Sequence, residues 1–230
     1  MLYENYEQVV ANVKKACERS GRNFQDITII AVSKTKPLSD VEELLSHGVM
    51  EFGENKVQEM VDKYEHVSKP VHWHLIGHLQ TNKVKYIVDK ACLIHSVDSV
   101  HLAKEIEKEA AKKGVVAKVL LEVNIAQEET KFGIREDEVY ALIDAIKDMP
   151  HVHVMGLMTI APFVENPEEN RVYFRKMHQL SLDIKSKCID NIDMSVLSMG
   201  MTNDYAVAIE EGATMVRVGT GIFGARNYNI

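Results

Sequence analysis

Short, nearly continuous apolar runs recur along this chain and alternate with segments of helical periodicity. Eight runs are strand-like: ITIIAVS (27–33), VMEFG (49–53), HWHLIG (72–77), CLIHSV (92–97), VAKVLLEVNI (116–125), VHVMGLMTI (152–160), MSVLSMG (194–200) and MVRVG (215–219). Strands that are apolar on both faces are typical of parallel sheets covered by helices. The pattern therefore predicts parallel strands in repeated β/α units.

The segments between these runs carry apolar residues at helical spacing. Residues 2–18 form a predicted amphipathic opening helix. Residues 102–110 continue the pattern, with Asp98 and Ser99 as capping candidates and Gly114 at the far end. Helices thus fill the gaps between the predicted strands.

Eight β/α units fit either an open doubly wound sheet or a closed barrel. The chain has 230 residues, of which 46% are hydrophobic, and no long linker or break in composition divides it. We therefore expect residues 1–230 to form one domain, a single (β/α)8 TIM-type barrel of the α/β class with an extra N-terminal helix. In that fold the active region lies at the carboxyl ends of the strands.

Charge and cysteine content narrow the class of protein. The formal net charge is −7 and no basic stripe is interleaved with aromatic residues, so we expect no nucleic-acid partner. Cys17, Cys92 and Cys188 are far apart, which argues against a disulfide framework and favours a reducing cytoplasm. The chain shows neither a secretory signal nor an apolar run long enough to span a bilayer, so we expect no membrane association.

Polar residues follow most of the predicted strands and would meet at one rim of the barrel. They are Lys34, Glu54, Asn55, His78, Asn124, Thr159, Ser198, Arg217 and Thr220. Lys34 is unusual because it ends an apolar strand. Burial lowers the pKa of an amine, and a neutral amine forms Schiff bases with aldehydes. The alternative is a solvated lysine at the end of a strand, since Lys36 and Pro37 follow it.

The segments LSMGMT (197–202) and VRVGTGIFG (216–224) are rich in glycine and hydroxyl groups. Each leads towards a helix, and backbone N–H groups at helix N-termini bind anions. In barrels the loops after strands seven and eight commonly hold phosphate. The GxGxxG spacing of 219–224 also occurs in dinucleotide-binding folds, but the βαβ unit that those folds require does not follow it. Phosphate binding is therefore the interpretation that we keep.

A reactive lysine after strand one and a phosphate cradle after strands seven and eight together suggest a phosphorylated aldehyde. Pyridoxal 5′-phosphate (PLP) fits both. Arg217 adds a third element, because a guanidinium is cationic and only donates hydrogen bonds. Placed against the pyridine nitrogen, it would keep that nitrogen unprotonated.

Several blocks of the chain resemble one known family. AVSKTKP (31–37), FGENKVQE (52–59), HLIGHLQTNK (74–83), GLMTIAP (156–162), SMGMTND (198–204) and VRVGTGIFGAR (216–226) are similar to the YggS/PROSC family of PLP-binding proteins. The match runs from about residue 27 to residue 226. The resemblance implies one barrel similar to the N-terminal domain of alanine racemase, and a carrier or regulator in vitamin B6 and amino-acid homeostasis without an established reaction.

The resemblance also assigns roles to residues. It implies that Lys34 forms the Schiff base, that Arg217 faces the pyridine nitrogen and that Asn55 lies beside the ring. The implied phosphate ligands are Ser198, Gly219 and Thr220, with Gly200 and Thr202 nearby. Two positions depart from the family pattern: Gly221 stands where alanine is commoner, and Thr202 where serine is commoner.

Two functions remain open at this point. In the first, Lys34 holds PLP reversibly and the protein, as a monomer, buffers the cofactor or delivers it to apo-enzymes. In the second, the protein is a weak amino-acid racemase or lyase with His78 or Tyr205 as the base. We favour the first, because alanine racemase takes its second base from an added C-terminal β-domain and this chain ends soon after strand eight.

Other reactive side chains have simpler interpretations. His72 and His74 form an HxH pair of the kind found in metal sites, and a zinc site would need further ligands at a suitable spacing. The flanking pattern places this face in the barrel core or on the rim, so we interpret both histidines as structural and predict no metal. Lys36 and Lys131 lie in polar stretches, which favours solvated lysines over aldehyde-binding ones.

Overall fold

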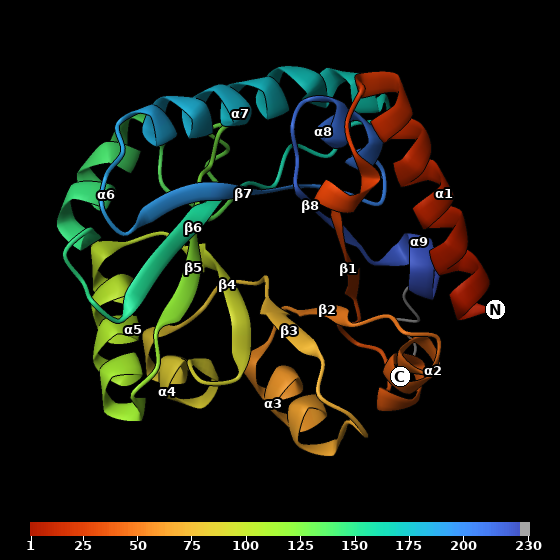
Figure 1. Ribbon diagram of the computed structural model, residues 1–230, viewed down its shortest axis with the longest axis horizontal. Helices are drawn as coiled ribbons and strands as arrows, with labels where there is room; N and C mark the ends of the chain where they lie inside the picture. The colour runs from red at the N-terminus through yellow and green to blue at the C-terminus, as the bar shows by residue number, and fades with distance from the viewer. Residues whose placement is uncertain (226–230) are drawn as a thin grey trace.

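The protein is a closed barrel of eight parallel strands, as the alternating pattern predicts (Figure 1). A computed structural model describes residues 1–225; Arg226, the last residue of the block VRVGTGIFGAR, lies outside them. The strands are β1 (Thr28–Val32), β2 (Glu51–Glu54), β3 (His72–Leu75), β4 (Ala91–Val97), β5 (Ala117–Glu122), β6 (Val152–Met158), β7 (Ile192–Met201) and β8 (Met215–Val218). Each of the eight predicted strands is confirmed, with ends shifted by up to three residues.

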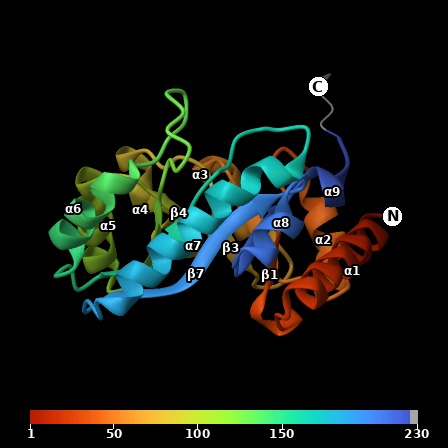
Figure 2. The same cartoon turned by 90° about the horizontal axis from the view of Figure 1, so that it is seen from above.

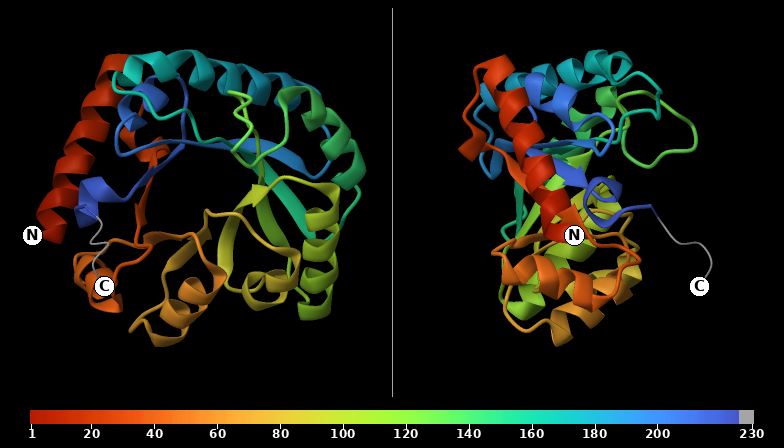
Figure 3. Two further views of the ribbon diagram at one scale, coloured as in Figure 1. Left: turned by 180° about the vertical axis from the view of Figure 1, so that it is seen from behind. Right: turned by 90° about the vertical axis from the view of Figure 1, so that its right-hand side faces the viewer.

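Helices surround the barrel on its outer side (Figures 1 and 3). They are α1 (Leu2–Ser20), α2 (Leu38–Ser46), α3 (Val57–His66), α4 (Val84–Ile87), α5 (Val100–Lys113), α6 (Val139–Ile146), α7 (Arg171–Ser186), α8 (Tyr205–Glu210) and α9 (Thr220–Phe223). Short 3₁₀ helices lie at Phe24–Asp26, Thr81–Lys83, Glu136–Glu138 and Pro167–Asn170. The expected caps of α5 are present: Ser99 Oγ accepts from Leu102 N at 3.2 Å, and Gly114 is left-handed at φ 66°.

The opening helix α1 is the extra element of the fold. It packs against α2, α8 and α9 on the side where the barrel closes (Figure 1). Closure itself comes from β1 pairing with β8, which places Ile30 opposite Arg217. The first and last strands are thus neighbours, and so are the loops that follow them.

Apolar side chains form two layers, one outside the sheet and one inside the barrel. The outer layer lies between the strands and the helices and contains Phe52, Trp73 and Phe174. The inner layer consists of smaller clusters, built around Ile30 and around Leu120. The inner layer leaves room for polar side chains that also point into the barrel.

The predicted fifth strand extends three residues too far at its carboxyl end, because β5 ends at Glu122. Asn124 N donates to Ile134 O at 2.8 Å, and the Asn124 side-chain amide donates to Glu128 O at 2.8 Å. These bonds close a loop that projects from the barrel between β5 and α6 (Figures 2 and 3). Among the described residues, no helix combines the length and the hydropathy needed to cross a lipid bilayer.

Candidate functional site

Lys34 follows β1 at the carboxyl rim of the barrel, where the sequence predicts it. Its side chain is half-buried and lines a small pocket together with Val32, Gly219, Thr220 and Phe223. The pairing of β1 with β8 explains this meeting of residues almost 190 positions apart. The structure therefore brings the candidate nucleophile and the candidate phosphate loop into one pocket.

A buried polar cluster fixes the backbone just before Lys34. Ser33 Oγ donates to Glu54 Oε1 at 2.6 Å, and Lys63 Nζ donates to the same Oε1 at 2.7 Å and to Ser33 O at 2.8 Å. Burial raises the pKa of Glu54, and the Lys63 ammonium opposes that rise. The cluster joins β1, β2 and α3 behind the pocket.

The residue after Lys34 is held as well. Thr35 has φ 63°, a left-handed conformation that is strained for a β-branched residue. Its N–H donates to Glu59 Oε1 at 2.6 Å, and Glu59 in turn accepts from Lys63 Nζ at 2.8 Å. Lys36 Nζ donates to Phe223 O at 2.8 Å. We call residues 33–36 the lysine turn; contacts on both sides restrict the position of Lys34.

The phosphate loop predicted after β8 leads directly into α9. Gly219 is the residue before this helix, and Gly221 N donates to Thr202 Oγ1 at 3.3 Å. Ile222 N and Phe223 N both donate to Gly219 O, at 3.0 and 2.9 Å, so an anion at this loop would be bound by the N–H groups at its start. Thr202 therefore supports the loop from β7, next to the predicted ligands Gly219 and Thr220.

Arg217 points into the barrel, where its side chain is only 4% exposed. Nη1 donates to Ser198 Oγ at 2.6 Å and Nη2 donates to Thr159 O at 2.8 Å. Burial lowers the pKa of Arg217 to about 10, against the opposing effect of Glu122 and Asp204. The guanidinium is thus still cationic at neutral pH and is held by Ser198 of β7 and by Thr159, the residue after β6.

The remaining predicted ligands lie at different depths. Ser198 is fully buried, and its Oγ also lies 3.0 Å from His95 Nδ1. Gly200 has φ 91°, and a Cβ there would lie 2.6 Å from Ala208 Cβ, so close packing against α8 requires glycine. Asn55 lines a separate pocket beside His78. The roles of all three toward a cofactor stay predictions.

His78 and Tyr205, the two bases considered for a catalytic function, lie in different parts of the barrel. Tyr205 OH accepts from Asn12 Nδ2 of α1 at 3.2 Å, on the outer side of the barrel. His78 stacks on Phe132, with 4.0 Å between the ring centroids, and its Nδ1 lies 3.8 Å from Asp98. His78 thus belongs to the rim, whereas Tyr205 is turned towards the helical layer.

Glu122 is a buried acid that sequence reasoning missed. It ends β5 and is 5% exposed. Burial raises the pKa of Glu122 to about 7, Asp98 adds to the rise and Arg217 opposes it. A carboxyl group that titrates near neutral pH beside a buried arginine is a candidate acid or base. The signal was present in the sequence, because an acid interrupts the apolar run KVLLEV (118–123).

A chain of hydrogen bonds runs on from Ser198 through the barrel interior, and it too was missed. His95 Nε2 lies 3.0 Å from His74 Nδ1, and His74 Nε2 lies 2.7 Å from Glu51 Oε2. Burial lowers the pKa of His95 well below its usual value, so this ring is neutral. Glu51 also contacts His72, so both histidines of the HxH pair have a carboxylate partner.

Comparisons with known proteins agree on the family of this chain. The profile of the family described as "Alanine racemase, N-terminal domain" matches residues 5–227. A protein of Aquifex aeolicus named "Pyridoxal phosphate homeostasis protein" is 46% identical over 226 residues, which cover 98% of both chains. The chain therefore has full-length relatives with that name.

Solved structures agree with this result. PipY of Synechococcus elongatus, solved with PLP bound, has a TM-score of 0.81 and 30% identity, and the match covers 93% of this chain and 100% of PipY. Alanine racemase of Clostridium difficile has a TM-score of 0.75 at 15% identity, and the match covers 99% of this chain and 60% of the racemase, which shows a shared fold. The chain belongs to the alanine racemase N-terminal domain family and, within it, to the pyridoxal phosphate homeostasis proteins.

Proposed function

We propose that this chain binds PLP as a Schiff base on Lys34 and acts in vitamin B6 and amino-acid homeostasis as a carrier of the cofactor. The observation that carries the proposal is the shared pocket of Lys34 with the loop of Gly219 and Thr220. PLP needs an amine at one end and an anion site at the other, and we assign these roles to Lys34 and to the loop of Gly219 and Thr220. The PLP-bound relative PipY and the names of the curated relatives support the same assignment.

The residues around the pocket favour binding of the cofactor over PLP-dependent catalysis. Bound PLP acts in catalysis as an electron sink, and protonation of its ring nitrogen strengthens that sink. Arg217 is a cation that donates hydrogen bonds, so opposite the ring nitrogen it would leave that nitrogen unprotonated. The lysine turn fixes the backbone on both sides of Lys34 at the rim of the barrel, where a recipient can approach.

A carrier must also release its cargo. Lys34 is half-buried, so water and amines can reach the bond that it forms. We therefore propose that the protein acts as a monomer in the cytoplasm and delivers PLP by transient contact with apo-enzymes. Transfer to an apo-enzyme, followed by the recovered activity of that enzyme, tests delivery directly. Equal rates of recovery with free PLP and with the loaded protein in the presence of a PLP trap would contradict it.

Borohydride reduction followed by peptide mass spectrometry tests the anchor. We expect the mass of reduced PLP on Lys34 in the wild type, and the yellow colour of the protein to be lost in Lys34→Ala. Lys36→Ala is the matched control, because Lys36 lines the same pocket and donates to Phe223 O. Label on Lys36 in the wild type, with Lys34 unmodified at saturating PLP, would refute the assignment.

A weak PLP-dependent racemase or lyase is the second candidate, and Glu122 favours it. The carboxyl group of Glu122 has a pKa of about 7, which suits an acid or base at neutral pH. Chiral analysis of single amino acids after long incubation with PLP-loaded protein tests this function. Turnover that is lost in both Lys34→Ala and Glu122→Gln would favour it over the carrier.

A further inference from the structure

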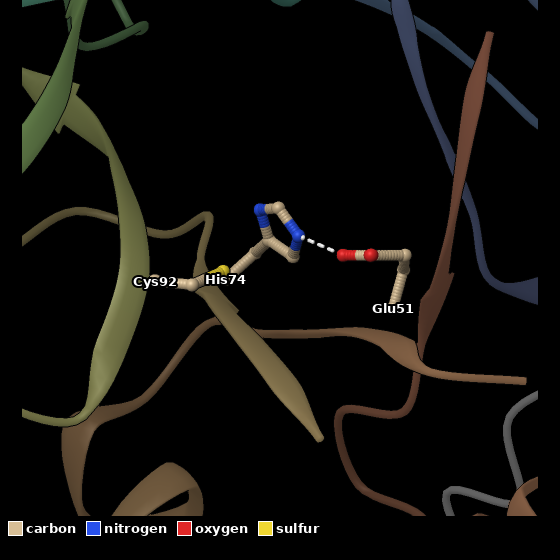
Figure 4. A group of neighbouring side chains, drawn as sticks. All are labelled: Glu51, His74 and Cys92. Atoms are coloured by element: carbon tan, nitrogen blue, oxygen red, sulfur yellow. Dashed lines mark hydrogen bonds and ion pairs between the residues drawn. The ribbon is translucent and has the colours of Figure 1, made fainter.

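The end of the barrel opposite Lys34 holds a second group of reactive side chains. Glu51 begins β2, His74 lies within β3 and Cys92 lies near the start of β4. One carboxylate oxygen, one imidazole nitrogen and the Sγ lie within 4.8 Å of one another (Figure 4). His74 is 2% exposed, whereas the other two are half-buried and line an open pocket. A ligand can therefore reach the group from solvent.

The three donors match the preferences of one class of metal. Zinc in proteins binds cysteine sulfur, histidine nitrogen and carboxylate oxygen with tetrahedral geometry. Bonds of about 2.0–2.3 Å separate such ligand atoms by roughly 3.3–3.8 Å. The three ligand atoms already lie within 4.8 Å of one another, so the side chains would need to move by only about 1 Å to bind the ion. A thiolate and a carboxylate also balance the two charges of the ion.

The neighbours of the group hold two of the three donors in place. His72 Nδ1 lies 2.6 Å from Glu51 Oε1, the oxygen that does not contact His74. On the other side His95 Nε2 lies 3.0 Å from His74 Nδ1, which leaves His74 Nε2 directed at the group. Partners of this kind orient metal ligands and set the tautomer of a ligating histidine.

We propose that Glu51, His74 and Cys92 form a binding site for one divalent transition-metal ion of the zinc type at the amino-terminal end of the barrel. The pocket beside these ligands is lined by the apolar side chains of Met155, Val196 and Met215 and also by Lys118. Coordination replaces the hydrogen bond between His74 and Glu51, and the thiol proton of Cys92 leaves to solvent. The proton on His74 Nε2 is also given up, and His74 then carries its proton on Nδ1 and donates to His95 Nε2, while His95 carries its own proton on Nδ1, next to Ser198 Oγ. The site lies at the other end of the barrel from the proposed cofactor pocket, and none of its three ligands is a predicted PLP ligand.

This proposal revises the structural interpretation of the HxH pair. The further ligands that such a pair needs, Glu51 and Cys92, come from the neighbouring strands β2 and β4. Pairing of β2 with β3 and of β3 with β4 brings them to His74. His72 is the outer partner of Glu51 and not one of the three ligands.

Titration of the purified full chain with Co²⁺ and Zn²⁺ tests the proposal. We expect one tight site and a thiolate-to-cobalt charge-transfer band in the wild type. Cys92→Ser should abolish the band and weaken Zn²⁺ binding by at least about 100-fold, and Glu51→Gln should weaken it as well. Cys188→Ser is the matched control, because Cys188 is an exposed cysteine, and this variant should keep both the band and the affinity.

A second measurement needs no variant. Zn²⁺ should slow alkylation of Cys92 at least tenfold and leave that of Cys188 unchanged, with a chelator reversing the effect. Alkylation of Cys92 at the same rate with and without Zn²⁺ would overturn the proposal. So would a charge-transfer band that persists in Cys92→Ser, or its absence from the folded wild type.

Discussion

Glu122 illustrates how a single residue can link stability to pH. The carboxyl group is buried at the end of β5 and has no hydrogen-bond partner for Oε2 among the described residues. Its pKa rises from the ordinary 4.5 to about 7 because burial penalises the charged form. The folded chain therefore binds a proton on Glu122 that the unfolded chain releases between these two pH values.

Replacement of Glu122 by glutamine should change how stability depends on pH. A raised pKa in the folded state stabilises the protein below about pH 4.5, and that stabilisation is lost as the pH rises through about 7. The contribution of Glu122 to the free energy of unfolding that is lost in this way is on the order of 3 kcal/mol. Relative to the wild type, Glu122→Gln should thus gain stability between pH 5 and pH 8, as measured by urea unfolding.

The matched control is Glu129→Gln, an exposed carboxyl group in the loop after β5. The difference in the free energy of unfolding between Glu129→Gln and the wild type should be the same at pH 5 and at pH 8. A constant difference between Glu122→Gln and the wild type across this range would contradict a raised pKa.

Gly221 and Thr202, the two departures from the family pattern, fit one another. A Cβ on Gly221 would lie 3.2 Å from Thr202 Cγ2 and 3.0 Å from Val218 Cγ1. Serine lacks the Cγ2 methyl but keeps the hydroxyl that accepts from Gly221 N. Threonine at 202 thus favours glycine at 221, and serine would remove one of the two close contacts that a Cβ at 221 meets.

A double-mutant cycle tests this fit. Gly221→Ala alone should destabilise the protein by about 1–3 kcal/mol through overpacking. The pair Gly221→Ala with Thr202→Ser should recover at least about 0.5 kcal/mol of that loss, measured by denaturant unfolding. Additive effects of the two substitutions would mean that the methyl group does not oppose a Cβ at 221.

At the scale of elements, α3 supports the turn that carries Lys34. Lys63 of α3 donates to Glu54 of β2, to Glu59 of its own helix and to Ser33 O. The side chains of Lys63 and Glu54 are 5% and 0% exposed, so the pair has little solvent screening. Removing one member of a buried pair is costly, because the other charge remains without compensation.

Lys63→Met should therefore destabilise the protein by about 3–5 kcal/mol and weaken PLP binding by loosening the lysine turn. Urea unfolding and absorbance titration with PLP measure the two effects. The double variant Lys63→Met with Glu54→Gln should lose less stability than Lys63→Met alone, since the buried charge is gone. Lys69→Met, at an exposed lysine, is the control. An equal loss of stability in Lys63→Met and Lys69→Met would contradict the role of Lys63 in supporting the lysine turn.

At the scale of the whole molecule, closure of the barrel builds the proposed cofactor pocket. Lys34 and Gly219 meet because β1 and β8 pair, and α1 covers the seam with α8 and α9. A ligand that binds both loops therefore joins the two ends of the chain. Binding to the native state alone adds to the free energy of unfolding of the entire barrel.

PLP should accordingly raise the melting temperature of the wild type. At about 100 times the dissociation constant the gain is about 2.7 kcal/mol. For a chain of this size that corresponds to a shift of about 5–10 °C. Lys34→Ala should show a much smaller shift under the same conditions, and Lys36→Ala should keep it. A full shift in Lys34→Ala would mean that the covalent anchor contributes little to binding.

Some of the site was predictable from the sequence and some was not. Lys34 and the loop at Gly219 and Thr220 could be predicted, because each follows an apolar strand and the carboxyl ends of parallel strands share one rim. The bond from Arg217 to Ser198 could not, because neither position shows how deep its side chain sits inside the barrel.

The amino-acid sequence by itself determined the β/α repeat, the eight strands and the polar residues at their ends, because periodicity and turn residues act locally. Only the tertiary structure decided which interior side chains touch, including the contacts of His95 with His74 and Ser198. The physical reason is that neighbouring strands are staggered as the barrel closes. This stagger sets the height of each side chain, and no stretch of sequence encodes it alone.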